Sequence, residues 1–404
     1  MKPTLSHRIY KAFYLTLSKF IGLFVNNKGS ELILFGARDG NYFMDNSRAL
    51  YEWYTQHKKG TEFYWMTVSP AVEKMLKSKG WPVKRIDSIA GIVALHKARY
   101  AFYTNRLRDV AIDYRAVPDN LKMIFLSHGQ SVKNTRLAVN VDVDAGFKKD
   151  SLKAARQTLF AVSTSPFMAQ VQSKSNGLKP EDYKLTGFPR NDWMFNPPAE
   201  AVADWNKFTG GRKYKKVILY APTWRRTDPK TVMFPFSDLD AKAFAKYIDD
   251  NDILLLLRPH IQDLKDNDGC AIVTRQLCGL SQNIRLATIT EFVEANFLLP
   301  FVDALISDYS SIYHDFLLLD RPIFFIPYDL HTFDQDNGFK YPYLEYLPGP
   351  VINTQEELVL AFNALLEGTD YFSGHREKLS NLIYTFKDGS AAQRLAEIDL
   401  DQVK

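Results

Sequence analysis

Short apolar runs recur along the chain, and a polar cluster follows many of them. From residue 31 onward, ELILFG, RYAFYTN, LKMIFLSHG and LFAVST alternate with longer polar stretches of helical composition. A second series comprises KKVILYAPTW, DILLLLRPH, NIRLAT, DALISDYSS and PIFFIPYDL. Such runs are typical of strands buried on both faces of a parallel sheet and joined by crossover helices. The pattern predicts an α/β protein built from two Rossmann-like halves.

The length of the chain also favours two domains. Its 404 residues exceed the usual size of a single hydrophobic core. The proline-rich stretch TGFPRNDWMFNPPAEA interrupts any regular element and predicts a linker near residues 187–203. We therefore expect an N-terminal Rossmann-like domain over residues 29–195 and a C-terminal one over residues 204–404. The second should end in helices from Thr354 onward, and the two domains should face each other across a cleft.

Composition excludes several classes of protein. The two cysteines, Cys270 and Cys278, cannot form a disulfide framework or a four-ligand zinc site, and they favour a reducing compartment. The formal charge of +5 is modest and forms no long basic tail, which argues against nucleic-acid binding. No further ligand with recognisable spacing accompanies His314 and Asp315, so we expect neither a metal nor a cofactor.

The N-terminal segment, residues 1–28, combines basic and apolar residues. Lys19 interrupts its apolar run, which is shorter than the roughly 20 residues that span a bilayer. The same segment lacks a small-residue cleavage site, so it is not a convincing signal peptide. Its pattern fits a helix lying on an anionic membrane surface, with Phe13, Leu17, Phe20 and Phe24 in the interface. It fits equally well a helix packed on the body of the protein.

Four polar clusters follow predicted strands, where ligands bind in open α/β sheets. They are Ser127-His128-Gly129, Thr223-Trp224-Arg225, Arg258-Pro259-His260 and Asp308-Tyr309-Ser310-Ser311. His128 could serve as a general base or as a hydrogen-bonded structural residue. Arg258 and His260 could bind an anion, or Arg258 could pair with a carboxylate.

The cluster at Asp308–Ser311 also has two interpretations. Ser310 and Ser311 fall at the start of a predicted helix over residues 312–319. They could be ordinary N-cap residues, or this helix start could bind an anion such as a phosphate. Lys133 could help to hold a phosphate or could be a solvated surface lysine.

Several ordered motifs carry a family resemblance. They are LFGARDGNYFMDNSRALYEW, SHGQSVK, TGFPRND, LYAPTWR, LRPH, LISDYSSIYHDFLLLDRPIFFIPYDL and LPGP. Together they resemble the CDP-glycerol glycerophosphotransferase family of teichoic-acid primases and polymerases, over most of residues 31–365. The resemblance implies a GT-B architecture and CDP-glycerol as the donor. It also implies that glycerol phosphate passes to a hydroxyl of a teichoic acid or capsule polymer, or of its lipid-linked primer, with CMP as leaving group.

The resemblance also assigns roles to individual residues. The family's essential histidines correspond to His128, on the acceptor side, and His260, on the donor side. We predict that the donor contacts Arg258, Ser310, Ser311, Asp308, Thr223, Trp224 and Arg225, and that Gly129, Lys133 and Arg190 bind the acceptor or a phosphate. Asn337-Gly338-Phe339 replaces the family's Arg-Gly-Phe, so Lys340 could supply the missing donor contact. The expected location is the cytoplasm, on the inner face of the cell membrane.

Two other functions remain open, because a fold does not determine chemistry. The chain could be a GT-B glycosyltransferase or epimerase that uses another nucleotide-activated donor. It could also be a catalytically silent scaffold of the same pathway, although both histidines remain in their motifs.

Overall fold

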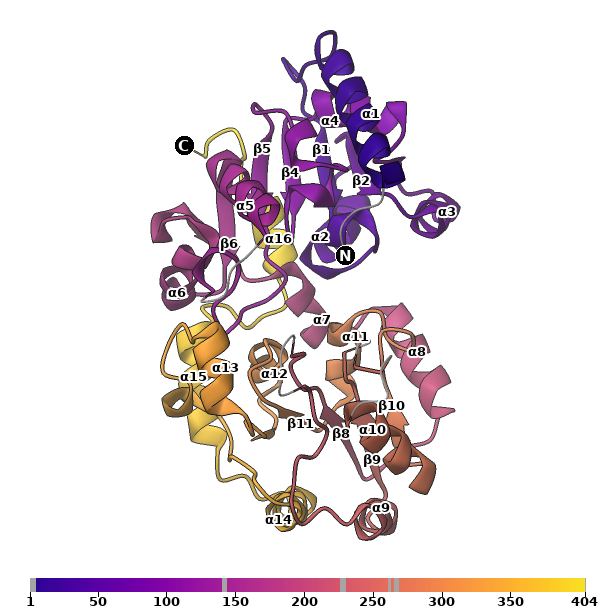
Figure 1. Ribbon diagram of the computed structural model, residues 1–404, viewed down its shortest axis with the longest axis vertical. Helices are drawn as coiled ribbons and strands as arrows, with labels where there is room; N and C mark the ends of the chain where they lie inside the picture. The colour runs from indigo at the N-terminus through magenta and orange to yellow at the C-terminus, as the bar shows by residue number, and fades with distance from the viewer. Residues whose placement is uncertain (1–4, 140–143, 226–229, 261–262, 265–268, 404) are drawn as a thin grey trace. The chain divides into compact units, whose positions relative to one another are not determined.

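The computed structural model describes residues 5–139, 144–225, 230–260, 263–264 and 269–403. Its fold comprises two compact units, each built on a parallel sheet (Figure 1). The first unit comprises Met1–His128, Thr135–Asp192 and Ser390–Lys404, and the second comprises Gly129–Asn134 and Trp193–Gly389. The prediction of two α/β halves is confirmed.

The first unit contains a seven-stranded sheet with the order β3-β2-β1-β4-β5-β6-β7. Its strands are β1 (Ile33–Gly36), β2 (Phe63–Thr67), β3 (Val83–Arg85), β4 (Tyr100–Tyr103), β5 (Lys122–Phe125), β6 (Thr158–Ser163) and β7 (Tyr183–Leu185). Its helices are α1 (Leu5–Gly22), α2 (Asp45–His57), α3 (Pro70–Ser78), α4 (Ile89–Lys97), α5 (Ala145–Gln157), α6 (Pro166–Asn176) and α16 (Ala391–Ala396). The strand pairs described in this sheet are all parallel, and two separate apolar clusters bury the sheet.

The second unit contains a five-stranded sheet with the order β10-β9-β8-β11-β12. Its strands are β8 (Lys216–Tyr220), β9 (Ile253–Leu257), β10 (Ile284–Leu286), β11 (Ala304–Ser307) and β12 (Ile323–Phe325). Its helices are α8 (Ala199–Thr209), α9 (Ala241–Asp250), α10 (Gly269–Leu280), α11 (Ala295–Leu298), α12 (Ile312–Phe316), α13 (Leu330–Asn337), α14 (Gln355–Glu367) and α15 (Ser373–Ile383). The short helix α7 (Asp192–Phe195) lies where the chain passes from the first unit to the second.

Local sequence signals explain where several helices begin and end. Ser165 accepts a hydrogen bond from the N–H of Met168 and precedes a proline at the first turn of α6. Thr354 likewise accepts from the N–H of Glu357 at the start of α14, and Gly368 ends that helix in a left-handed conformation. These are the usual uses of Ser, Thr, Pro and Gly at helix ends.

The observed division of the chain corrects the predicted boundaries. Ser390–Lys404 belongs to the first unit, although we expected the second domain to run to residue 404. The carboxylate of Asp192 accepts hydrogen bonds from the N–H groups of Ala391 (2.8 Å) and Ala392 (2.9 Å) at the start of α16. Leu395 is buried in the first unit's core, and α16, yellow in Figure 1, packs against α2. Pairings between residues almost 200 positions apart leave no local signal in the sequence.

The predicted strands agree with the structure, but three strands of the first sheet were missed. These are β2, β3 and β7, of which β3 and β7 are three-residue edge strands. The expected helix at residues 312–319 is present as α12 followed by a 3-10 turn over Leu317–Leu319. The C-terminal region after Thr354 is helical, as predicted, with breaks between α14, α15 and α16.

The capping of α16 by Asp192 can be tested by unfolding. Asp192→Ala removes an acceptor for two backbone N–H groups, so we expect the free energy of unfolding to fall by about 0.5–2 kcal/mol. Denaturant titration followed by circular dichroism measures this. Asp119→Ala, which removes only a surface ion pair with Lys153, is the matched control and should lower the free energy of unfolding by less. Equal losses in the two variants would contradict the capping role.

Candidate active site

The turn after β5 positions His128 in the first unit. Ser127 adopts a left-handed conformation (φ 59°), which is uncommon for a residue with a side chain. The side-chain amide of Asn46 donates to the carbonyls of Leu126 (3.0 Å) and Ser127 (3.0 Å). Arg190 donates from Nη1 to the carbonyl of His128 (2.8 Å). These buried contacts hold the strained turn and thereby fix the direction of the histidine.

Arg190 is itself held by the start of α2. Its Nη1 donates to Oδ1 of Asp45 (2.9 Å), and its backbone N–H donates to Oδ1 of Asn46 (3.1 Å). Both ionic side chains are buried. Asp45 adopts a left-handed conformation (φ 71°). The structure therefore brings the predicted pair of His128 and Arg190 together, through two residues that we did not predict.

The imidazole of His128 lies in positively charged surroundings. Burial, together with the guanidinium groups of Arg38, Arg190 and Arg136, lowers its pKa to about 4, while Asp45 acts in the opposite direction. Its Nδ1 is buried and has no hydrogen-bond partner among the described residues. His128 is consequently neutral at pH 7 and can accept a proton.

Gly129 and Lys133 follow His128 in sequence but belong to the second unit. Lys133 forms a bridge with Phe339, and Val132 accepts a hydrogen bond from the N–H of Lys340 (2.7 Å). Gly129 has φ 127°, which suits a residue without a side chain at this change of direction.

Lys340 is half-buried beside Lys133. Burial, and then the charge of Lys133, lowers the pKa of the Lys340 ammonium to about 7. Burial lowers the pKa of His314 to about 3, and the charge of Lys340 acts in the same direction. His314 belongs to α12, which begins directly after Ser311, so the charge of Lys340 acts on the helix that the predicted phosphate-binding serines precede.

In the second unit, Asp308 connects the ends of β8 and β11. Its two carboxylate oxygens accept from the N–H of Thr223 (2.9 and 3.1 Å), and it forms an ion pair with Arg225. Arg225 also donates to both oxygens of Asp329 (2.9 and 2.8 Å). Because these three ionic side chains are buried and engaged with one another, they hold the loops at the carboxyl ends of the strands.

Trp224 and His260 are exposed and stack on each other, with ring centroids 5.2 Å apart. They come from the exits of the adjacent strands β8 and β9. The hydroxyl of Thr223 is buried without a hydrogen-bond partner among the described residues. This hydroxyl is available to a ligand.

Arg258 is half-buried, and its guanidinium holds the neighbouring loop. It donates to the carbonyls of Ala287 (2.6 Å) and Phe292 (2.9 Å). Burial lowers its pKa to about 10, and the nearby Glu294 and Glu291 act against that shift. The expected alternative, a direct pairing with a carboxylate, is replaced by these contacts with backbone carbonyls.

Ser310 and Ser311 are half-buried at the start of α12. Ser311 makes no side-chain capping hydrogen bond, so the ordinary N-cap interpretation is wrong for this residue. The buried His314 bonds to the hydroxyl of Tyr341 (2.7 Å) and to the carbonyl of Gln130 (3.3 Å). These contacts give His314 a structural role.

Sequence reasoning missed Asp45 and Asn46 in the first unit and Asp329 in the second. Asp45 and Asn46 stand inside the quoted motif LFGARDGNYFMDNSRALYEW, which was the available signal. Among the described residues, we find no group of three or more His, Cys, Asp or Glu side chains suited to hold a metal.

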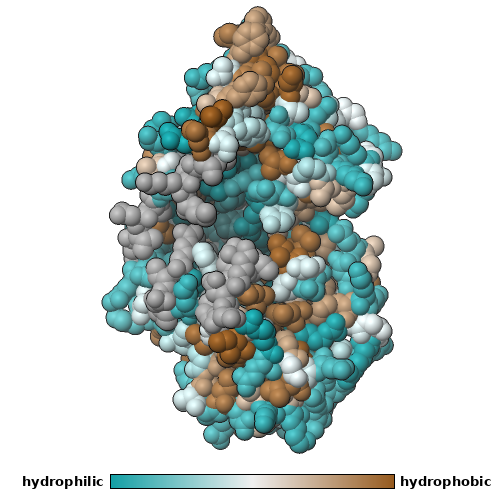
Figure 2. Space-filling model, turned by 45° about the vertical axis from the view of Figure 1, so that its right-hand side comes forward, coloured by the Kyte–Doolittle hydropathy of each residue, from teal (hydrophilic) through white to brown (hydrophobic). Residues whose placement is uncertain are grey.

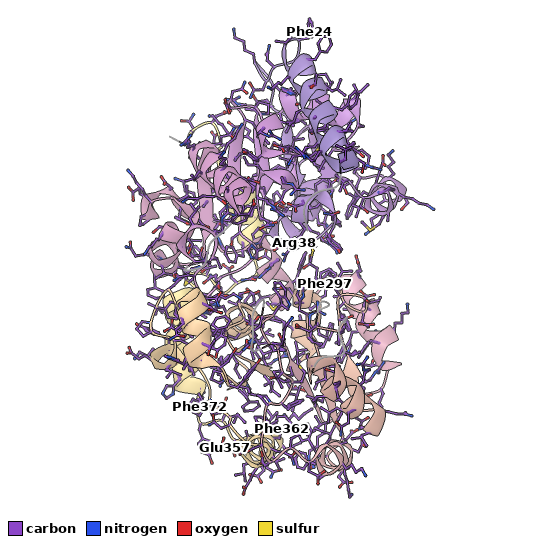
Figure 3. All side chains as sticks on the ribbon, in the orientation of Figure 1. Phe24, Arg38, Phe297, Glu357, Phe362 and Phe372 are labelled. Carbon is purple, nitrogen blue, oxygen red and sulfur yellow. The ribbon has the colours of Figure 1, made fainter. Side chains whose placement is uncertain are left out.

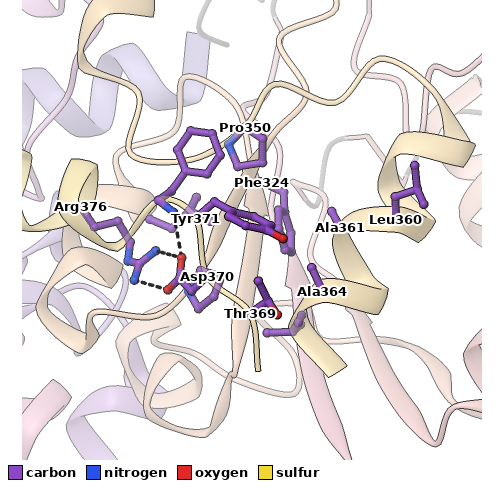
Figure 4. Close-up of a pocket in the computed structure, with 13 residues that line it drawn as sticks. Phe324, Pro350, Leu360, Ala361, Ala364, Thr369, Asp370, Tyr371 and Arg376 are labelled. Atoms are coloured by element: carbon purple, nitrogen blue, oxygen red, sulfur yellow. Dashed lines mark hydrogen bonds and ion pairs between the residues drawn. The ribbon is translucent and has the colours of Figure 1, made fainter. Parts of the chain in front are cut away.

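A pocket of about 260 Å³ lies elsewhere in the second unit (Figure 4). It is lined mainly by apolar side chains of β12 and α14, with Tyr371 across it. Arg376 at its edge is already paired with Asp370 and Asp320. The pocket contains none of the predicted site residues.

Comparison with known proteins finds several teichoic acid enzymes that are similar to this chain. The teichoic acid glycerol-phosphate transferase of Staphylococcus aureus is 27% identical, over 98% of this chain and 98% of that protein. A teichoic acid poly(glycerol phosphate) polymerase of Bacillus spizizenii is 26% identical, over 88% of this chain and 87% of that protein. The solved structure of the wall teichoic acid polymerase TagF superposes with a TM-score of 0.76 at 20% identity, over 98% of this chain and 95% of that one.

The structural likeness confirms the predicted fold. Residues 18–398 match the family described as CDP-glycerol:poly(glycerophosphate) glycerophosphotransferase, which is most of the chain. The family resemblance predicted from the motifs is thereby confirmed. The chain belongs to the CDP-glycerol:poly(glycerophosphate) glycerophosphotransferase family.

Proposed function

We propose that this protein transfers glycerol phosphate from CDP-glycerol to a hydroxyl of a teichoic acid chain or its lipid-linked primer. The acceptor oxygen forms a bond to the phosphorus that carries glycerol, and the bond from that phosphorus to the bridging oxygen breaks. CMP leaves with the bonding electrons. The observation that carries the proposal is the neutral His128 on a rigid strand exit, in a chain whose family is defined by this reaction.

His128 acts as the general base in this proposal. Its imidazole takes the proton of the acceptor hydroxyl as the new oxygen–phosphorus bond forms. Arg190 donates a hydrogen bond to the backbone carbonyl of His128. It therefore positions His128 by holding the turn rather than the imidazole ring. Gly129 lets the backbone approach the acceptor closely.

The second unit binds the donor in this proposal. The hydroxyls of Ser310, Ser311 and Thr223 donate to the pyrophosphate oxygens, and Trp224 packs against the nucleotide. His260 stabilises the charge that develops on the departing CMP. Asp308, Arg225 and Arg258 hold these groups in place through the contacts described above. Lys133 and Lys340 add positive charge for a phosphate, in place of the family's arginine.

We favour CDP-glycerol over CDP-ribitol as the donor because the similarity to a glycerol-phosphate transferase extends over more of both chains. The glycerol-phosphate transferase matches over nearly its whole length, whereas the ribitol-phosphate polymerase TarL of Staphylococcus aureus is 29% identical over 61% of this chain and 42% of that protein. Incubation with CDP-glycerol, CDP-ribitol and a UDP-sugar, followed by chromatography of the released nucleotide, tests the assignment. We expect CMP from CDP-glycerol, and release of UDP would instead support a glycosyltransferase or epimerase.

We also propose that α1 attaches the protein to the inner, cytoplasmic face of the cell membrane. One side of α1 packs on the first unit through Tyr14, which is 3% exposed, and Ser18, which contacts His96. The other side exposes large apolar side chains, including Phe13 at 65% and Phe20 at 60%, and Phe24, just after the helix, is 74% exposed. Figure 2 shows hydrophobic atoms gathered at the end of the molecule where α1 lies, and Figure 3 labels Phe24 there.

The interpretation of α1 as a packed helix thus fits one of its faces, and the interpretation as a membrane-surface helix fits the other. Leu17 packs against the core instead of joining the exposed side, while Leu5, Ile9 and Leu23 join it. In the described part of the chain, we find no helix that is long and apolar enough to cross a bilayer. An exposed apolar stripe beside Arg8 and Lys19 suits reversible attachment to an anionic surface.

The role of His128 predicts both a loss of activity and a pH dependence. His128→Ala should lower the rate of CMP release by about 10²–10⁴-fold, because general base catalysis contributes roughly that much. With free glycerol as a neutral acceptor, the rate of the unmutated protein should change little between pH 7 and pH 5.5, since a histidine with a pKa of about 4 stays neutral there. If the base were an ordinary imidazole with a pKa near 6.5, the rate at pH 5.5 would be about tenfold lower.

Calorimetry with CDP-glycerol separates catalysis from binding in the same variant. We expect His128→Ala to keep its affinity for the donor. A loss of donor affinity as large as the loss of rate would reassign His128 to binding.

The predicted phosphate site at α12 can be tested by removing two hydroxyls. Ser310→Ala combined with Ser311→Ala should weaken CDP-glycerol binding by roughly 10-fold or more, because two hydrogen bonds to a charged group are lost. Calorimetry measures the dissociation constant, and Ser237→Ala, at an exposed serine of the same unit, is the control. An unchanged dissociation constant in the double variant would remove these serines from the donor site.

Attachment through α1 can be tested without disturbing its packed face. Replacing Ile9, Phe13 and Phe20 together by serine removes exposed apolar area only, so the variant should fold normally but sediment less with vesicles containing anionic lipid. Co-sedimentation at low and high salt measures the effect. If the variant and the unmutated protein sediment equally, the membrane assignment is wrong.

A further inference from the structure

Arg38 stands on a loop whose backbone is held in an unusual conformation. The loop follows β1 and contains the 3-10 turn Arg38–Gly40, in which Arg38 (φ 50°) and Asp39 (φ 56°) are both left-handed. A non-glycine residue in this region costs energy, and two in succession persist only when their surroundings impose the conformation.

The surroundings of this loop do impose that conformation. The buried carboxylate of Asp109 accepts from the N–H groups of Asp39 (2.9 Å), Thr104 (3.0 Å) and Asn105 (2.7 Å). Arg106 pairs with the side chain of Asp39. These contacts join the exits of the neighbouring strands β1 and β4, so the position of Arg38 is built into the sheet.

The guanidinium of Arg38 is little used by the protein itself. It donates no hydrogen bond to the residues that the structure describes, although Arg carries five N–H donors. Its closest ionic contact, from Nε to Oδ2 of Asp45, is 3.7 Å and therefore too long for a hydrogen bond. Nε is buried, while the side chain as a whole is 40% exposed. Arg38 is labelled in Figure 3.

Arg136 contributes a second partly used guanidinium near His128. Its Nη1 donates to the carbonyl of Asn105, and its Nε is buried without a partner among the described residues. Arg136 is also left-handed (φ 55°). Burial raises the pKa of Asp150, and the charge of Arg136 acts against that shift. The charges of Arg38, Arg136 and Arg190 all act on the imidazole of His128, and Asp45, the ionic contact of Arg38, is already bonded to Arg190.

We propose that Arg38, assisted by the charge of Arg136, binds a phosphate group of the acceptor next to the hydroxyl that His128 deprotonates. This inference rests on the proposed function and specifies its acceptor. The substrate class is a polyol phosphate chain, in which a phosphodiester adjoins the terminal hydroxyl. A planar guanidinium can bind two phosphate oxygens at once, which a lysine ammonium does not match.

Binding of this phosphate would also help the base. A negative charge beside the imidazole favours its protonated form, so the pKa of His128 rises from its low value toward neutrality. A base of higher pKa takes a hydroxyl proton more readily. The anionic acceptor would therefore activate the residue that deprotonates it, and a neutral alcohol would not.

The test compares two acceptors across matched variants. The unmutated protein should prefer a short glycerol phosphate oligomer over free glycerol, and kcat/KM for CMP release gives the ratio. Arg38→Gln should lower this ratio by roughly 10- to 100-fold, because charge-assisted hydrogen bonds to phosphate are lost. Arg38→Lys, which keeps the charge, should recover part of the preference. Arg85→Gln, at an arginine paired with Asp87 in the same unit, should keep the ratio of the unmutated protein.

A second measurement separates this inference from the proposed function. If the unmutated protein releases no CMP from CDP-glycerol with any acceptor, the proposed function fails. Calorimetry with the same oligomer still tests Arg38, since Arg38→Gln should bind it at least 10-fold more weakly than Arg85→Gln does. An unchanged acceptor ratio, or equal affinity of these two variants for the oligomer, would overturn the inference.

Discussion

A buried carboxylate joins neighbouring strand exits in each unit, and the candidate site depends on these two groups. Asp109 accepts backbone N–H groups from the loops after β1 and β4, and Asp308 accepts the N–H of Thr223 after β8. Parallel strands bring their carboxyl ends to one edge of a sheet, but they do not determine the conformation of the loops there. The carboxylates do so, because a buried acceptor without its donors would be costly.

Electrostatics then give the two units different chemistry. In the first, burial and three guanidinium groups keep His128 neutral, which suits a base. In the second, Arg225 is neutralised by Asp308 and Asp329, while Lys133 and Lys340 lie close enough for the charge of one to lower the pKa of the other. The roles that we propose, a proton acceptor on one unit and phosphate-binding groups on the other, are those that transfer from a nucleotide-activated donor requires.

The sequence was informative where the signal is local. Apolar runs predicted β1, β4, β5 and β6 and all five strands of the second sheet, and the polar residues after them include His128 and His260. What could not be predicted depends on distant contacts. Asp192 caps α16 from almost 200 residues away, and Asp45 reaches Arg190 across 145 positions. The left-handed conformations of Ser127 and Arg38 likewise follow from tertiary hydrogen bonds, since neither residue type favours them.

The central claim is that glycerol phosphate moves intact from CDP-glycerol to an acceptor hydroxyl. The most direct measurement follows CMP release and the mass of a glycerol phosphate oligomer in the same reaction. The account predicts one added glycerol phosphate unit for each CMP released, and neither product above background with His128→Ala. Release of CMP while the acceptor mass stays unchanged would contradict it, because the donor would then be hydrolysed instead of transferred.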